Sequence, residues 1–315
     1  MYKKTLDQAF EVAGTVQNWQ QLVDQEKFWS GENEEWVFRG DSCDRPLQST
    51  LERLRPAEMQ PPIDIRELEY HFYRDFKRTF PIHASRMPEF LTRDDTTPYW
   101  LSLMRHFGVP TRLLDFSYSL FMATFFALER QKTSDEKDEA VVWVISKTWL
   151  TKKNVKAMFK NGGETFCVEW GKRTTEAFEK IFWDKASPYS PGVFPVNAAS
   201  NHQRLHLQQG LFLCPVSIER SFSENLTADQ DYTGKVLKLL INRSCRAEVL
   251  LKLHRCGISR ELLFPGLDGY AQGLQSRTPV LYSHLKKLEE NGARVSINDR
   301  GDFLWKDYYD KYCKE

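Results

Sequence analysis

Hydrophobic and polar positions alternate along most of the chain with the spacing of helices or of strands. Helices are expected where apolar residues return every three or four positions, and strands where β-branched and apolar residues form short continuous runs. The predicted helices are 6–28, 50–55, 65–80 (ended by Pro81), 97–107, 119–130 and 244–256. The predicted strands are 36–39, 140–146, 211–216 and 235–241, and the alternation in 201–212 predicts an extended segment.

This mixture of elements predicts an α+β protein, in which several helices flank a mixed β-sheet core. The sequence has no internal repeat, low-complexity tract or obvious linker, so a single domain is expected over residues 1–315. A chain of this length can bury a large core. We interpret 147–200 as a helical insertion and 276–315 as a C-terminal extension, while 257–269 has the composition of a loop.

Composition narrows the choice of function only slightly. The 44 Lys and Arg residues nearly balance the 43 Asp and Glu residues, so net charge alone indicates neither a nucleic-acid nor a membrane partner. The six cysteines lack the spacing of a zinc site and are expected to be free thiols in a reducing cytoplasm. The apolar runs are too short to cross a bilayer, and acidic residues interrupt the N-terminal segment, so we expect a cytoplasmic protein without membrane association.

The most informative stretch is Arg105–Phe126, which leads from a Gly/Pro turn into an apolar helix. So many polar groups in front of a core helix are typical of a pocket. His106 either contacts a substrate or satisfies backbone carbonyls at a helix end. Arg112 and Asp115 are expected to form an internal ion pair, because burying either charge alone is costly. The polar residues of the stretch include His106, Thr111, Arg112, Asp115, Ser117 and Ser119.

Two further groups of residues have the chemistry of a binding site. Arg39 ends a predicted strand before Gly40, and its planar guanidinium either clamps a phosphate or carboxylate or pairs with an internal carboxylate such as Asp115. Gln208 and Gln209 precede another strand, where their amides suit a sugar or base edge or simply hold a loop.

A basic, aromatic-rich segment and the absence of several known motifs bear on function as well. Residues 147–185 mix nine Lys or Arg with five Asp or Glu and several aromatics, so this segment either binds nucleic acid or supplies the core face of two helices. Rossmann, P-loop, α/β-hydrolase and zinc-protease motifs are absent from the sequence.

Several segments together resemble the FRG-domain family, which is named for a Phe-Arg-Gly triplet, here Phe38-Arg39-Gly40. The resemblance runs from about residue 16 to 275, and its HxGxPTRLLD segment is highly specific. Phe116 stands where the family usually has Trp. FRG proteins occur mostly in bacteria and phages. The matching segments are Trp36–Gly40, His106–Phe116, Phe121–Ala127, Gln208–Phe212 and Leu263–Gly269.

The order of these motifs also resembles, more distantly, the ADP-ribosyltransferase fold. Those enzymes have Arg-Gly on a first strand, then a Ser-containing strand that leads into an A-x-x-F-A helix and a further strand. A final strand carries Gln-x-Glu or Glu-x-Glu. The corresponding segments here are Arg39-Gly40, then Leu114–Ser119 with Ala123–Ala127 and the strand 141–145, and finally Gln208–Gly210 before the strand 211–216.

This second resemblance implies a split sheet and NAD-dependent ADP-ribosyl transfer by a bacterial toxin or antiphage effector. It implies an RNA, DNA or protein acceptor and a cognate antitoxin or inhibitor. Arg39 would hold the pyrophosphate, Ser117 would brace the ribose, and the third motif would bind the 2′-hydroxyl and orient the acceptor. The expected catalytic residues are Arg39, His106, Ser117 and Gln209, and the expected NAD-binding residues are Arg39, Gly40, Thr111, Arg112, Asp115 and Gln208.

The third motif contains no Glu, and Gln can neither stabilise positive charge nor accept a proton. Either a carboxylate from elsewhere supplies that role, with Asp115, Glu129 and Asp268 as candidates, or the third motif lies elsewhere in the chain. The main alternative is a ligand- or nucleic-acid-binding regulatory module without catalysis. A nuclease or another hydrolase is a further alternative.

Overall fold

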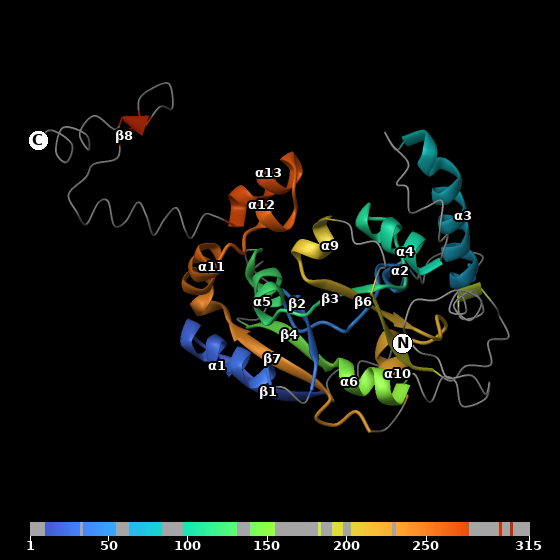
Figure 1. The fold of residues 1–315 in the computed structure, drawn as a ribbon, viewed down its shortest axis with the longest axis horizontal. Coiled ribbons are helices and arrows are strands. Elements are labelled where there is room, and N and C mark those ends of the chain that lie inside the picture. The colour runs from blue at the N-terminus through green and yellow to red at the C-terminus, as the bar shows by residue number, and fades with distance from the viewer. Residues whose placement is uncertain are drawn as a thin grey trace, which may run out of the picture.

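A seven-stranded sheet forms the centre of the protein in the computed structural model, with the strand order β1-β7-β4-β2-β3-β6-β5 (Figure 1). The structure describes residues 10–31, 34–54, 63–83, 97–130, 139–154, 182–183, 191–197, 203–228, 231–276, 296–297 and 303–304. The strands of this sheet are β1 (Glu11–Val16), β2 (Trp36–Asp41), β3 (Leu114–Ser117), β4 (Glu139–Ser146), β5 (Val193–Val196), β6 (Gly210–Pro215) and β7 (Val236–Asn242).

The sheet is mixed, because β1 runs parallel to β7 and all other neighbouring strands are antiparallel. Strand β4 lies in its interior, and all its residues from Ala140 to Ser146 are buried, as its continuous apolar run predicts. The α+β class and the predicted strands 36–39, 140–146, 211–216 and 235–241 are therefore confirmed.

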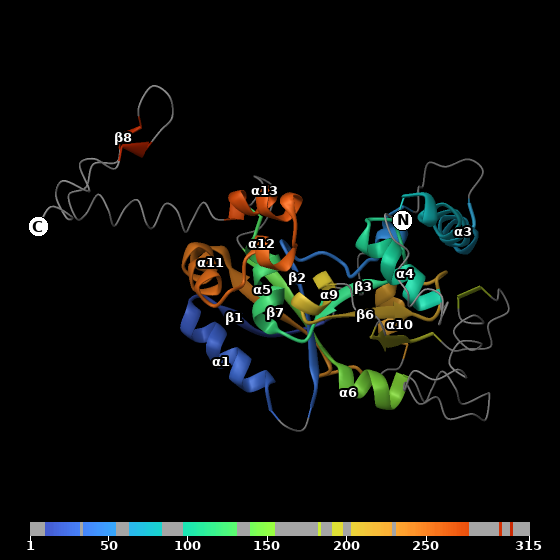
Figure 2. The ribbon, with the colours of Figure 1, turned by 45° about the horizontal axis from the view of Figure 1, so that its top comes forward.

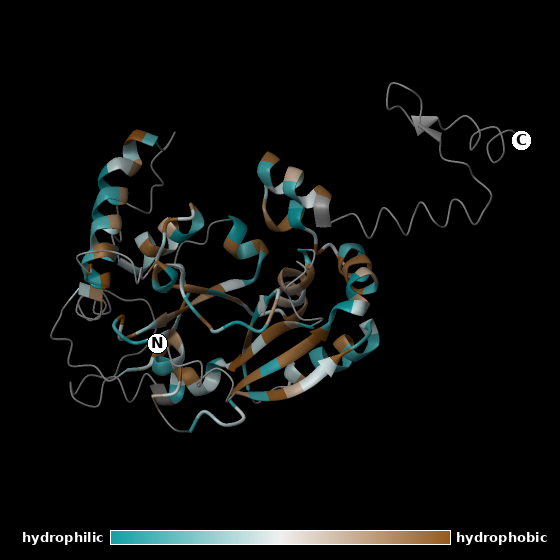
Figure 3. Cartoon of the chain, turned by 180° about the vertical axis from the view of Figure 1, so that it is seen from behind, coloured by the Kyte–Doolittle hydropathy of each residue, from teal (hydrophilic) through white to brown (hydrophobic). Residues whose placement is uncertain are grey.

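Helices cover one face of the sheet through a continuous hydrophobic cluster. Alternate β4 residues such as Val142 and Val144 pack on this face, whereas Val141 and Trp143 pack on the other. Figure 2 shows helices α1, α5 and α11 along the first face, and Figure 3 shows the hydrophobic strands beneath them. These helices are α1 (Trp19–Trp29), α5 (Leu120–Leu128) and α11 (Arg246–Arg255).

Of the remaining helices, α12 and α13 lie beside α5 and α11, where Leu263 joins the same hydrophobic cluster, and the others lie around the rest of the sheet (Figure 1). Helix α3 is largely hydrophilic and lies at the edge of the molecule (Figure 3). These helices are α2 (Thr50–Arg53), α3 (Ile65–His83), α4 (Thr97–His106), α6 (Lys147–Trp149), α9 (Gln203–Leu207), α10 (Phe222–Leu226), α12 (Arg260–Leu263) and α13 (Leu267–Ser276). A short strand pair, β8 (Ser296–Ile297) and β9 (Phe303–Leu304), and the short helices η3 (Leu150–Asn154, a π-helix) and η4 (Arg243–Cys245, a 3₁₀-helix) complete the described elements.

The helix predicted over 6–28 is wrong in its first half, where the chain forms strand β1. Val12 and Val16 are four residues apart, a spacing that a helix and a strand both satisfy. Hydrogen bonding to β7 decides between them, and β-branched residues favour the extended form. Helix α1 begins after Asn18, whose side chain accepts a hydrogen bond from the Gln21 amide.

Two other local predictions need correction. Helix α3 passes through Pro81 and ends at His83, so the proline does not stop it. The alternating segment 201–212 is not extended throughout, because 203–207 forms helix α9. Leu205 of this helix packs so closely on Gly210 that a Cβ atom there would collide with its side chain. The expected loop 257–269 contains α12 and the start of α13.

Only part of the predicted insertion falls on residues that the structure describes. Most of the predicted helical insertion 147–200 lies outside the described residues, and its described part contains α6 and the edge strand β5. None of the helices in the described ranges combines the length and apolar character that crossing a membrane requires. Four cysteines within those ranges, Cys43, Cys214, Cys245 and Cys256, are free thiols.

Candidate functional site

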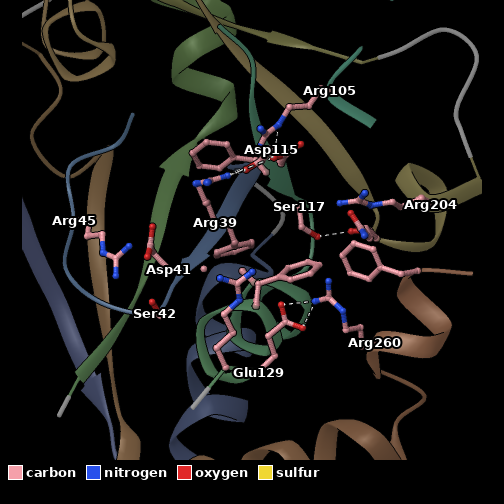
Figure 4. Close-up of a pocket in the computed structure, with 18 of the residues that line it drawn as sticks. Arg39, Asp41, Ser42, Arg45, Arg105, Asp115, Ser117, Glu129, Arg204 and Arg260 are labelled. Carbon is pink, nitrogen blue, oxygen red and sulfur yellow. Dashed lines mark hydrogen bonds and ion pairs between the residues drawn. The ribbon is translucent and has the colours of Figure 1, made fainter. Parts of the chain in front are cut away.

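A cavity of about 370 Å³ lies where strands β2 and β3 meet helix α5 and the segments carrying α9 and α12 (Figure 4). Its lining is dominated by arginine. The lining arginines among the described residues are Arg39, Arg45, Arg53, Arg105, Arg130, Arg204 and Arg260, and the lining carboxylates are Asp41, Asp115 and Glu129. Seven guanidiniums against three carboxylates leave a surplus of four positive charges, which suits an anionic ligand.

The cavity opens where the pairing between two neighbouring strands of the sheet is shortest. Strands β2 and β3 are paired only at Phe38 and Ser117, so their backbones diverge on either side of this pair. Arg39 reaches across the gap, and its Nη1 donates a 2.7 Å hydrogen bond to the backbone carbonyl of Asp115. The guanidinium thus takes the place of a backbone partner and leaves its remaining donors near the cavity (Figure 4).

Asp115 is the carboxylate that both Arg39 and Arg105 face at the cavity. Arg105 donates to its Oδ2 from Nε at 3.0 Å and from Nη2 at 2.5 Å, while Arg39 Nη1 lies 3.8 Å from the same oxygen. Burial alone would raise the pKa of Asp115, but the charge and hydrogen bonds of Arg105, together with Arg39, lower it overall. The interpretation of Arg39 as the partner of an internal carboxylate is therefore confirmed.

The predicted Arg112–Asp115 ion pair is wrong. Arg112 pairs instead with Glu69 of α3, with 2.6 Å between its Nε and Oε2, and both side chains are almost completely buried. The Arg112 guanidinium also lies over the ring of Phe182. Thr111 is buried too, and its backbone amide donates to Thr50 Oγ1. Neither Thr111 nor Arg112 lines the cavity, so both hold the surrounding helices together.

Gly40 borders the cavity but faces helix α5. A Cβ atom at this position would collide with the carbonyl oxygen of Ala123 and lie 2.6 Å from the amide nitrogen of Ala127. The glycine of the Phe-Arg-Gly triplet thus lets α5 pack directly against β2. Its contribution to the cavity is indirect, because it keeps α5 close to Arg39.

Ser117 and Gln208 bring the second and third motifs together. Ser117 Oγ donates a 2.8 Å hydrogen bond to the carbonyl oxygen of Gln208, and the Gln208 side chain donates to the Leu263 carbonyl at 3.1 Å. Both residues line the cavity. Gln209 is exposed, has a φ of 46° and does not line it, because it forms the tight turn into β6. The structure therefore brings Gln208, and not Gln209, to Arg39 and Ser117.

The opposite wall carries a second ion pair and an aromatic stack. Arg260 Nη1 lies 2.6 Å from a carboxylate oxygen of Glu129, at the end of α5. The Phe264 ring lies between two guanidiniums, with Arg204 at 4.1 Å on one side and Arg260 at 4.3 Å on the other. Burial, together with the neighbouring Arg105 and Arg260, lowers the pKa of Arg204. The stack thus concentrates positive charge beside Gln208.

His106 lines a smaller, adjoining cavity of about 220 Å³ and not the arginine-lined one. The two cavities share Arg105, Asp115, Arg204 and Gln208. Burial, together with Arg204, lowers the pKa of His106 below its ordinary value of 6.5, which favours the neutral imidazole. A ligand that extends through the shared wall would contact it.

Most of the arginines of this site were not predicted from the sequence patterns. Arg45, Arg53 and Arg130 stand singly in unrelated segments and belong to no motif, so only the fold brings them together. Arg204 and Arg260 do lie in or beside segments with a recognisable polar pattern. No group of three or more His, Cys, Asp or Glu residues in the described ranges could hold a metal ion.

Residues 34–136 match the family model of the FRG domain. The match includes most of the residues that line the cavity, and only Arg204, Gln208, Arg260 and Phe264 of the described lining lie outside it. The extension of this domain to 16–275 stays a prediction. No curated protein and no solved structure matches the chain.

Proposed function

We propose that this protein binds NAD in the arginine-lined cavity and transfers its ADP-ribosyl group to a macromolecular acceptor. One observation carries the proposal. Arg39, Ser117 and Gln208 come from the three motifs of the ADP-ribosyltransferase resemblance, and all three line the same cavity. The strands that carry or follow these motifs, β2, β3 and β6, are adjacent in the sheet.

The cavity has the chemistry that the pyrophosphate of NAD requires. Arg39 is only 17% exposed and is fixed by Asp115, so its guanidinium is already oriented before a ligand arrives. Burial lowers its pKa, yet an arginine remains charged at neutral pH. Arg105 is held cationic by Asp115, which raises its pKa against the effect of burial. Two oriented guanidiniums can clamp a diphosphate with little further loss of side-chain entropy.

The transfer breaks the bond between C1′ of the ribose and the nicotinamide nitrogen, and nicotinamide leaves with the bonding electron pair. The acceptor nucleophile then supplies the electron pair of a new bond to C1′. Positive charge develops on the ribose in the transition state, as in glycoside hydrolysis, so a nearby carboxylate stabilises it. Gln208 cannot do this, but its amide can orient a hydroxyl group.

Glu129 is the carboxylate that best fits this role. It lines the cavity with Arg39 and Ser117, and its side chain is 10% exposed. Asp115 is engaged by two arginines, whereas among the described residues Glu129 is paired with Arg260 alone. Asp268 does not line the cavity. We therefore assign charge stabilisation to Glu129 and anchoring of the arginines to Asp115.

The biological setting follows from the family resemblance and belongs to the same proposal. An ADP-ribosylating enzyme of this type would act as a bacterial toxin or antiphage effector in the cytoplasm. A cognate antitoxin or inhibitor would then control it.

The test is incubation with adenylate-labelled NAD and separate RNA, DNA and protein acceptors. Wild-type protein should label one acceptor class, and Arg39→Gln and Glu129→Gln should each lose the labelling by at least about 100-fold, the size expected for removing a key electrostatic group. Arg74→Gln, on exposed helix α3, is the matched control and should label normally. Absence of NAD binding by the wild-type protein would overturn the proposal.

A non-catalytic binding module is the second candidate. It is favoured by the fact that Asp115 and Glu129, two of the three carboxylates that line the cavity, are both engaged in ion pairs. In that case NAD or another anion would bind to the wild type and not to Arg39→Gln, but no acceptor would become labelled.

A further inference from the structure

The smaller cavity differs in chemistry from the arginine-lined cavity that it adjoins. Its charged lining residues, Arg105, Asp115 and Arg204, all belong to the wall that the two cavities share. The described lining that is not shared consists of Ser102, His106, Gly108, Leu205 and Phe212. Leu205 and Phe212 are buried and apolar. A ligand that fills both cavities should therefore place its charge at the shared wall and an uncharged ring in the smaller cavity.

Two residues of helix α4 supply polar groups to the smaller cavity. Ser102 is fully buried, and its hydroxyl has no hydrogen-bond partner among the described residues. Such a hydroxyl is costly to bury unless a ligand or a water molecule pairs with it. His106 lies one turn further along the same helix face and is half-buried. Its neutral imidazole, favoured by the lowered pKa, has one donor and one acceptor nitrogen, as the edge of a nucleobase requires.

The two cavities together have the size and the charge pattern of a nucleotide site. Their volumes of about 370 and 220 Å³ fall, when combined, in the range of about 300–1,000 Å³ that is typical of small-molecule sites. The shared wall carries Arg105 and Arg204, whose guanidiniums suit a phosphate group. A nucleotide can therefore place its phosphate at this wall and its base in the smaller cavity.

The position of Glu129 decides which half of NAD enters the smaller cavity. Of the two cavities, Glu129 lines the larger one alone, and in Figure 4 Arg39 lies between Glu129 and Arg105. The proposed function places the nicotinamide ribose beside Glu129 and the diphosphate at Arg39 and Arg105. In NAD the adenosine is attached to the other end of the diphosphate. It therefore extends past Arg105 toward His106.

We propose that the smaller cavity is a nucleobase pocket that receives the adenine of NAD. Leu205 and Phe212 contribute its apolar walls. Ser102 and His106 contribute the groups that pair with the edge of the base. This inference rests on the proposed binding of NAD and on the role of Glu129. His106 then contributes to the affinity for the nucleotide and not to the step that breaks the bond to nicotinamide.

The pocket can be tested on the wild type without an acceptor. Isothermal titration calorimetry compares AMP, ribose 5-phosphate and nicotinamide mononucleotide, each of which carries one phosphate group. The wild type should bind AMP at least about tenfold more tightly than ribose 5-phosphate, because the base adds buried apolar surface and hydrogen bonds. Equal affinities for AMP and ribose 5-phosphate would overturn the proposal.

Two variants test the orientation of NAD. His106→Leu removes both ring nitrogens, and Ser102→Ala removes the hydroxyl. Each should weaken the binding of AMP by about three- to tenfold, as expected for the loss of one hydrogen bond, and leave the affinity for nicotinamide mononucleotide unchanged. His71→Leu, at an exposed position of α3, is the matched control and should bind both nucleotides like the wild type. A loss confined to nicotinamide mononucleotide would contradict the proposal.

Urea unfolding separates a binding role of Ser102 from a structural one. Because its hydroxyl has no partner among the described residues, Ser102→Ala should unfold at no lower urea concentration than the wild type. A lower midpoint, together with unchanged binding of AMP, would show that the hydroxyl stabilises the fold and would reject its assignment to the pocket.

Failure of this inference is distinguishable from failure of the proposed function. A preference for AMP that depends on Ser102 and His106, without NAD-dependent labelling of any acceptor, would retain the pocket and reject the transferase. Labelling that Arg39→Gln loses, with the wild-type KM for NAD in Ser102→Ala/His106→Leu, would retain the transferase and reject the pocket.

Discussion

Ser117 Oγ donates a 2.8 Å hydrogen bond to the backbone carbonyl of Gln208, across 91 positions of the chain. The Ser117 hydroxyl also accepts a hydrogen bond from the amide of Ser119, at 3.1 Å. A single buried hydroxyl therefore joins the end of β3, the start of α5 and the turn before β6. These segments carry two of the three motifs that surround the cavity.

Replacing Ser117 with Ala should destabilise the fold by about 1–3 kcal/mol, because the variant leaves two part-buried backbone groups, the Gln208 carbonyl and the Ser119 amide, without this partner. Urea unfolding measures this. Ser244→Ala, at an exposed position, should stay within about 0.5 kcal/mol of the wild type. A Ser117→Ala variant as stable as this control would contradict the structural role of the hydroxyl.

Gly40→Ala should cost about 1–3 kcal/mol, because a methyl group there must displace the backbone of α5. The loss of stability should be accompanied by weaker ligand binding, since α5 would move away from Arg39. Gly14→Ala in β1 is the matched control, because its Cβ would meet nothing closer than 3.7 Å. Similar unfolding free energies for the two variants would show that the close approach at Gly40 is unimportant.

Arg112→Met should lower the free energy of unfolding by about 3–5 kcal/mol, because it leaves the Glu69 carboxylate buried without its cation. Arg112→Met/Glu69→Leu should recover much of this loss, since no isolated charge remains. Chemical denaturation of the wild type, both single variants and the double variant measures the coupling. Strictly additive effects would mean that the two side chains do not stabilise each other.

The periodicity of the sequence was sufficient for the interior of the sheet but not for its edges. Val141–Ile145 is apolar on both faces, which only a central strand requires, and β4 has this position. Strand β1 buries only Val16 of its six residues, so its pattern is too weak to distinguish a strand from a helix. Pairing with β7 fixes its conformation, and a local pattern contains no information about a partner about 225 residues away.

The site was predictable only where its residues lie in compact motifs. Arg39 and Ser117 follow recognisable patterns, and both line the cavity. The partner of Arg112 was not predictable, because Asp115 is near in sequence whereas Glu69 is brought close by the packing of α3. Gln209 was a natural choice over Gln208, but only the backbone conformation of the turn decides which amide faces inward.

Asp115 should make the free energy of unfolding depend on pH in the acidic range. Its pKa in the fold is below the ordinary value of 3.8, because Arg105 and Arg39 favour the charged form over the effect of burial. As the pH falls, Asp115 of the unfolded chain is therefore protonated first. The stabilisation that the charged Asp115 gives to the fold is complete above pH 3.8, and it is lost as the pH falls to the lower pKa of the folded protein. The stability difference between wild type and Asp115→Asn should thus be large at about pH 6 and shrink at about pH 3. A difference that is independent of pH would contradict this.

Isothermal titration calorimetry of NAD into the wild type, Arg39→Gln and Arg74→Gln tests the central claim most directly. If the arginine-lined cavity is the NAD site, the wild type and Arg74→Gln should bind with equal affinity, and Arg39→Gln should bind at least about tenfold more weakly, as expected for the loss of a charge-assisted pair of hydrogen bonds. Equal affinities for all three proteins, or no binding by the wild type, would contradict it.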